Sequence, residues 1–162
     1  MRIVKDQQII DDSWMHIADG DALPTSGGVI VSLNRWNSEK AALLARKAPL
    51  GLRLKSDEEP EAVASDVPHF QLIAVEFPKF TDGRGYTTGR LLRERFGFKG
   101  ELRAIGHVLR DQMFYMWRCG FNAFELPAGK SLDDALTAYK DFSVTYQPAA
   151  DDQRPLYRRV HR

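Results

Sequence analysis

The spacing of hydrophobic and polar positions changes repeatedly along this chain. From residue 29 onward, short aliphatic runs alternate with stretches in which apolar residues recur at helical spacing. The runs predict strands over residues 29–33, 50–54, 72–77, 102–105 and 123–126. The intervening and following stretches predict helices over residues 38–47, 57–67, 87–96, 108–118 and 131–142. Such alternation is typical of an α/β domain with a mainly parallel sheet.

Two topologies fit about five mainly parallel strands in one domain. Our first interpretation is an open doubly wound sheet, with right-handed crossovers that place helices on both faces. The alternative is a half-barrel, because each predicted strand carries a polar residue near its C-terminal end. These residues are Ser32, Arg53, Glu76, Arg103 and Glu125. Either topology gathers functional groups at the carboxyl ends of the strands.

The pattern is weaker at the two ends of the chain. Residues 1–28 predict an N-terminal segment with a hairpin around Asp6-Gln7 and a lid containing Trp14 and Ile17, and residues 29–145 form the α/β domain. Residues 146–162 show no helical or strand period and are rich in basic residues. We interpret them as a tail that is either a solvated terminus or a docking arm for an acidic partner. The docking residues would be Arg154, Tyr157, Arg158 and Arg159.

Composition narrows the classes of function. The 162 residues are most simply one domain, and 23 Lys and Arg nearly balance 22 Asp and Glu. We therefore expect no nucleic-acid or membrane partner, and no apolar run reaches the roughly 20 residues of a membrane span. The single cysteine, Cys119, excludes an intrachain disulfide and an all-cysteine metal centre. We expect a cytoplasmic protein without a metal or cofactor.

The stretch from Glu76 to Arg90 is the densest candidate site, because a strand-to-helix turn there combines glycines with several charges. Glycines permit close backbone approach, and a helix N-terminus attracts anions. The spacing matches neither a P-loop nor a dinucleotide fingerprint. We predict an anion site, or else a structural turn in which Asp82 caps the helix or pairs with Arg84. The predicted anion-binding residues are Lys79, Asp82, Gly83, Arg84, Gly85 and Arg90.

Charged residues inside the predicted strands form a second candidate site. Arg53, Glu76, Arg103 and Glu125 alternate in sign along the strand series, which predicts ion pairs or an acid–base pair lining a pocket. His107 and Asp111 lie four residues apart at the start of a predicted helix. A histidine oriented by a carboxylate can act as a base, although a capped helix start explains the same spacing.

Five further motifs stand out: Glu76 to Gly85, Leu91-Leu92-Arg93, Gly100 to Ala104, Leu109 to Gln112 and Arg118 to Phe121. Together they resemble a bacterial family of unknown function, DUF934. Genes of that family often lie beside assimilatory sulfite reductase, and its members are loosely described as oxidoreductases of sulfite reduction. The resemblance implies a role in sulfur assimilation and cysteine biosynthesis. It implies no catalytic residue.

Three functional hypotheses follow. The first is a non-enzymatic accessory protein of sulfite assimilation that binds the reductase or its electron donor. The second is a small α/β oxidoreductase or oxyanion-binding enzyme acting on sulfite or a phosphorylated metabolite. The third is a folding or stability helper whose glycine turn is purely structural. Whether the chain is an enzyme stays open, because it has no flavin, nicotinamide or cluster motif.

Overall fold

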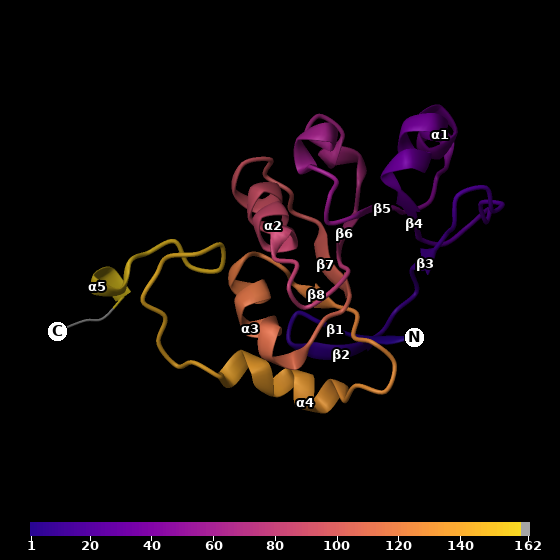
Figure 1. Ribbon diagram of the computed structural model, residues 1–162. Coiled ribbons are helices and arrows are strands. Elements are labelled where there is room, and N and C mark those ends of the chain that lie inside the picture. Colours follow the sequence, from indigo (N-terminus) through magenta and orange to yellow (C-terminus); the bar gives the residue numbers. More distant parts are fainter. Residues whose placement is uncertain (160–162) are drawn as a thin grey trace.

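One mixed sheet organises the molecule (Figure 1). The computed structural model describes residues 1–159. Its eight strands lie in the order β2-β1-β8-β7-β6-β5-β4-β3, and β3 to β8 are parallel to one another. The strands are β1 (Arg2–Lys5), β2 (Gln8–Asp11), β3 (Met15–His16), β4 (Val29–Ser32), β5 (Leu50–Leu54), β6 (Leu72–Phe77), β7 (Glu101–Gly106) and β8 (Ala123–Phe124).

Helices α1 to α4 lie along one side of this curved sheet, and α5 lies apart from it in the tail (Figure 1). They are α1 (Leu33–Ala45), α2 (Arg84–Glu94), α3 (Arg110–Arg118), α4 (Leu132–Thr137) and α5 (Leu156–Arg159), with 3₁₀ turns η1 (Pro60–Val63), η2 (Val67–His69) and η3 (Ala138–Lys140). Strands β4 to β8 are neighbours in chain order, so right-handed crossovers all fall on the same face. The α/β class is confirmed, and the topology is the half-barrel rather than the doubly wound sheet, because the strand order never reverses.

Alternation along the strands separates two faces. The outer face carries Val31, Leu52, Val75 and similar residues, which pack against the helices in the main core. The inner face carries a smaller apolar cluster of Ile30, Leu72, Ala74 and Ile105, with Trp14 packed on it. Both faces are therefore partly buried, but only the outer one is covered by helices.

The predicted hairpin is confirmed and extends the sheet. Asp6 and Gln7 adopt φ values of 48° and 61°, as the two central positions of a type I′ turn require. β1 pairs antiparallel with β8. Residues 12–17, called the strap below, then run from β2 at one edge of the sheet to β3 at the other (Figure 1).

Two predicted helices differ from those observed. The helix predicted over residues 38–47 begins at Leu33, because the Ser32 hydroxyl accepts a hydrogen bond from Arg35 N at 3.0 Å and caps it; Glu39 leaves helical geometry within it. The helix predicted over 57–67 is two 3₁₀ turns, η1 and η2. Pro68 lacks the backbone N–H that would continue a helix between them.

The remaining helix boundaries shift by a few residues. The helix predicted from Thr87 begins at Arg84, and that predicted from Val108 begins at Arg110. The helix predicted from Ser131 begins at Leu132, because the Ser131 hydroxyl accepts a hydrogen bond from Asp134 N at 3.1 Å and caps it. The tail contains the short helix α5, where no period was predicted, and its residues 160–162 lie outside the described residues. Within residues 1–159, no helix has the length and apolarity that a bilayer crossing demands.

Candidate functional site

The polar residues of the strand ends share the inner face of the half-barrel. Strand register places Arg53 beside Ala74, Ala74 beside Arg103 and Arg103 beside Ala123 in one row. Glu76 lies beside Ile105 in the next row. Residues paired across neighbouring strands point to the same face, so these charges face the space that the strap crosses.

Arg103 is the centre of this face and is completely buried. Its guanidinium donates to Asp12 at 2.7 and 2.8 Å, to Glu101 at 2.7 Å and to Glu125 at 3.4 Å. Burial by itself would raise the pKa of the Asp12 carboxyl, but the hydrogen bond and charge of Arg103 outweigh it and hold the pKa below its usual range. The buried charges are thus mutually compensated, and Asp12 fixes the strap to β7.

A second contact of the strap joins His16 to Glu125. The His16 Nε2 atom lies 3.0 Å from a Glu125 carboxylate oxygen, which links β3 at the edge of the sheet to the segment just after β8. Burial favours a higher pKa for Glu125, yet His16 and Arg103 together lower it. Glu125 is therefore an ionised partner that orients the His16 imidazole.

A cavity of about 400 Å³ opens at the carboxyl ends of β4 and β5, beside the end of the strap. His16, Asp19, Ser32 and Arg53 are the polar side chains in its wall. Ser32 and Asn34 donate to the two oxygens of Asp19, at 2.5 and 3.1 Å. The nearest carboxylate oxygen to Arg53 belongs to Glu76 and lies 4.0 Å away, which is too long for a hydrogen bond.

The structure brings four of the predicted site-lining residues to one face and leaves two elsewhere. Arg53 lies near Glu76, and Arg103 contacts Glu125. His107 and Asp111 are both exposed. α3 begins only at Arg110, so His107 precedes the helix and the expected four-residue helical spacing does not occur. A catalytic role for any of these residues stays a prediction.

The glycine turn before α2 is internally satisfied. The Arg84 side chain donates to Asp82 at 3.0 and 2.7 Å, and Arg84 N donates to Asp82 at 3.2 Å. The hydrogen bonds from Arg84 lower the pKa of Asp82. Arg90 donates to Glu94 at 3.0 Å, and Lys79 is exposed. An oxyanion at this turn stays a prediction, and it requires displacing Asp82 from Arg84.

The glycines of this stretch serve packing. A Cβ on Gly85 would lie 2.7 Å from the ring of Phe77, and one on Gly89 would overlap the ring of Phe121. Gly83 has a φ of −92°, and a Cβ on it would make only an ordinary contact with the Tyr86 ring, at 3.7 Å. Gly85 and Gly89 therefore let α2 lie close to aromatic rings of the core. The groups that their backbone approaches are side chains of this protein.

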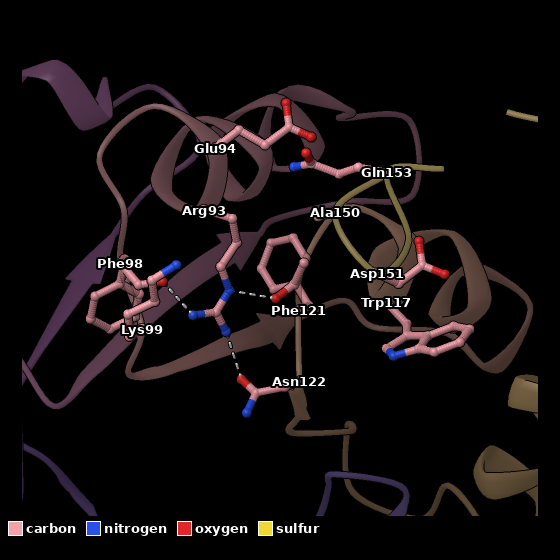
Figure 2. A pocket seen from close by; sticks show the side chains of 11 residues that line it. Arg93, Glu94, Phe98, Lys99, Trp117, Phe121, Asn122, Ala150, Asp151 and Gln153 are labelled. Carbon is pink, nitrogen blue, oxygen red and sulfur yellow. Dashed lines mark hydrogen bonds between the residues drawn. The ribbon is translucent and has the colours of Figure 1, made fainter. Parts of the chain in front are cut away.

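A different pocket lies at the amino ends of β7 and β8 and surrounds Arg93 (Figure 2). Arg93 donates to the carbonyls of Gly120, Phe98 and Gly100 at 2.9, 2.7 and 2.8 Å, and to the Asn122 side chain at 3.1 Å. Burial lowers its pKa. Because its donors point at acceptors of the fold, Arg93 is a structural clamp that joins α2 to the segments entering β7 and β8.

The predicted docking residues lie in a tail that folds against α3. Arg118 is buried at the end of α3 and pairs with Asp151 at 2.9 Å. Arg154 pairs with Asp152, and Arg159 donates to Thr145. Tyr157 is 75% exposed, and the Arg158 guanidinium stacks over its ring. The docking role stays a prediction for all four.

Sequence reasoning placed Trp14 and Ile17 of the strap in a lid but gave no role to Asp12 and His16. Asp12, Trp14 and His16 follow one another at intervals of two, which is the period of one face of an extended chain. That alternation was a usable signal, although the prediction of a lid did not draw on it. Nothing in the sequence around Asp19 or Glu101 indicated that either residue belongs to the site. Among residues 1–159, no group of three or more His, Cys, Asp or Glu side chains could hold a metal ion.

Comparison with known proteins agrees with the motifs. The model of a family described as "Bacterial protein of unknown function (DUF934)" matches residues 51–157. The chain belongs to the DUF934 family. The matched range begins at the second residue of β5 and contains β6 to β8, the glycine turn and the Arg93 clamp, whereas the hairpin and strap precede it. No curated protein matches the chain, and no solved structure does.

Proposed function

We propose that this DUF934 protein is an accessory protein of assimilatory sulfite reduction, acting in the cytoplasm and binding the reductase or its electron donor. The observation that carries the proposal is a run of exposed aromatic and apolar side chains between residues 142 and 157, called the tail surface below. Phe142, Val144, Tyr146 and Tyr157 are 62%, 64%, 77% and 75% exposed. Exposed apolar groups gathered on one segment mark binding surfaces more often than scattered single residues do.

The composition and position of this tail surface favour a protein partner. Phe142 packs against Phe114 of α3 with tilted rings whose centroids lie 5.0 Å apart, so part of the segment is anchored to the body. The chain then runs past α3, where Asp151 pairs with Arg118, and ends in α5 (Figure 1). Tyrosine, phenylalanine and arginine are enriched in protein interfaces, and Arg158 adds an exposed cation beside Tyr157. The choice of reductase or donor rests on the gene neighbourhood typical of the family.

Co-purification with the reductase and with its electron donor tests the proposal. At low salt, where electrostatic attraction is strongest, the wild-type chain should retain one of them. A Tyr146→Ala, Tyr157→Ala variant should lose the association while keeping its melting temperature. Phe80→Ala is the matched control, because Phe80 is 56% exposed but lies in the glycine turn. If neither the reductase nor its electron donor co-purifies with the wild-type chain at low salt, the proposal is overturned.

Growth of a deletion strain provides the genetic test. Rescue of growth by cysteine but not by sulfite is expected, since the defect should lie at the reduction of sulfite. Normal growth on sulfate as the only sulfur source would contradict the assigned pathway.

A further inference from the structure

The cavity beside the strap has a polar wall of mixed charge. It lies at the carboxyl ends of β4 and β5, which is where parallel sheets place their ligands. Its wall combines one guanidinium, one carboxylate and one imidazole, from Arg53, Asp19 and His16. Its volume of about 400 Å³ is within the range of small-ligand sites.

Arg53 supplies donors that the fold does not use. Its register with Ser32 on one side and Ala74 on the other fixes it on the inner face. Glu76 stands 4.0 Å from the guanidinium, and within residues 1–159 the Arg53 side chain makes no hydrogen bond. An arginine fork with free N–H groups binds carboxylates in a bidentate manner.

Asp19 supplies the complementary acceptor. Ser32 and Asn34 each donate to a different oxygen of the Asp19 carboxylate, which fixes its orientation. A carboxylate has about four lone-pair sites, so each oxygen can accept a further hydrogen bond. The hydrogen bonds from Ser32 and Asn34 lower the pKa of Asp19, and the group is ionised at neutral pH.

These two groups discriminate between ligand classes. A simple oxyanion would meet Arg53 favourably but would be repelled by Asp19. A simple cation would be attracted by Asp19 but repelled by Arg53. We propose that the cavity binds a zwitterionic α-amino acid, with its carboxylate on Arg53 and its ammonium on Asp19. The His16 imidazole, held by Glu125, forms the wall beside the bound ligand.

This inference is independent of the proposed partner binding. The cavity residues come from the inner face, from the end of the strap and from the two residues after it, whereas the tail surface lies between residues 142 and 157. If a variant loses ligand binding in the cavity, its partner binding can still be measured on the same purified protein, and the reverse is also true.

Thermal denaturation of the full chain with small probes tests the inference. A ligand that binds only the folded protein raises its melting temperature. Among the standard L-α-amino acids, at least one should raise it, while acetate, sulfite, inorganic phosphate and ethylamine should not. Stabilisation by an oxyanion alone would assign the cavity to anions and overturn the inference, as would the absence of stabilisation by every amino acid.

Four variants locate the site by calorimetric titration with the stabilising amino acid. Arg53→Gln and Asp19→Asn should each weaken binding by about tenfold or more, since each removes one ionic contact. The amide oxygen introduced by the second substitution can still accept from Ser32, which keeps the contact with the end of β4, whereas the amide nitrogen cannot accept from Asn34. Lys55→Gln and Asp21→Asn remove the same charges at nearby exposed positions and should bind as the wild type does. Unchanged binding by the Arg53 and Asp19 variants would overturn the inference.

Discussion

Arg103 shows how one side chain can fix several segments at once. Its partners Asp12, Glu101 and Glu125 come from the strap, from β7 itself and from the segment after β8. Lys5 of the hairpin adds a contact to Glu101 at 2.8 Å. A buried ion cluster of this kind adds little net stability over an apolar core, but removal of one member leaves uncompensated buried charge. The arrangement therefore specifies where the strap lies.

The pH dependence of stability should report this cluster. The pKa of Asp12 is lower in the folded chain than the value near 3.9 of an unfolded aspartate, so its contribution is present above about pH 4 and is lost as the pH falls. Asp12→Asn should lower the free energy of unfolding by about 1–3 kcal/mol at pH 7, and by less at pH 3. Urea denaturation at both pH values measures this.

Asp11→Asn is the control for that measurement. Asp11 is exposed at the end of β2, and its substitution should leave stability within about 0.5 kcal/mol at both pH values. A loss in Asp12→Asn that stays equal at pH 7 and pH 3 would show that the ionised carboxylate is not the stabilising species.

At the scale of elements, the strands were predictable and the helix starts were less so. The aliphatic runs predicted β4 to β7 almost to the residue, because a strand buried on both faces reads as a continuous apolar run. The start of α1 was misplaced because its first turn carries Arg35 and Trp36 on buried positions, which the spacing of later alanines does not indicate. Ser32 was correctly assigned to a strand, but its second role as the N-cap of α1 was not predicted.

Substitutions in α2 should distinguish packing from ligand binding by its glycines. Gly89→Ala should destabilise the chain by about 1–2 kcal/mol, because the new methyl group would overlap the buried ring of Phe121. The cost of this clash exceeds the gain from alanine's higher helix propensity. Gly83→Ala should change stability by less than about 1 kcal/mol, since its nearest neighbour is 3.7 Å away. Thermal and urea unfolding give both values. Equal losses in the two variants would contradict the packing explanation.

At the scale of the whole molecule, the two ends of the half-barrel are built differently. At the amino ends of the strands, the Arg93 clamp connects three backbone carbonyls and Asn122 (Figure 2). At the carboxyl ends, the cavity keeps Arg53 without a hydrogen bond in the described part of the chain. This division is the one seen in barrels of parallel strands, where one end serves stability and the other holds ligands.

Arg93→Lys should therefore reduce the free energy of unfolding without affecting the binding of the protein partner. A lysine carries three donors on one atom and cannot reach acceptors spread around a planar fork, so carbonyls of the clamp would lose their partners. We expect a loss of about 2 kcal/mol in the free energy of unfolding. Arg95→Lys, at an exposed ion pair with Glu61, should cost less than about 0.5 kcal/mol. Reduced partner binding by folded Arg93→Lys protein would contradict a purely structural role.

The sequence by itself determined the strands, the hairpin turn and the polar residues at the strand ends, because each depends on local spacing and on the preferences of a few adjacent residues. Only the tertiary structure decided that the helices share one face, that Asp12 reaches Arg103 and His16 reaches Glu125, and that α2 needs glycine against aromatic rings. Those features depend on which distant segments become neighbours when the sheet curves. Contacts between residues about a hundred positions apart leave no periodic trace in the chain.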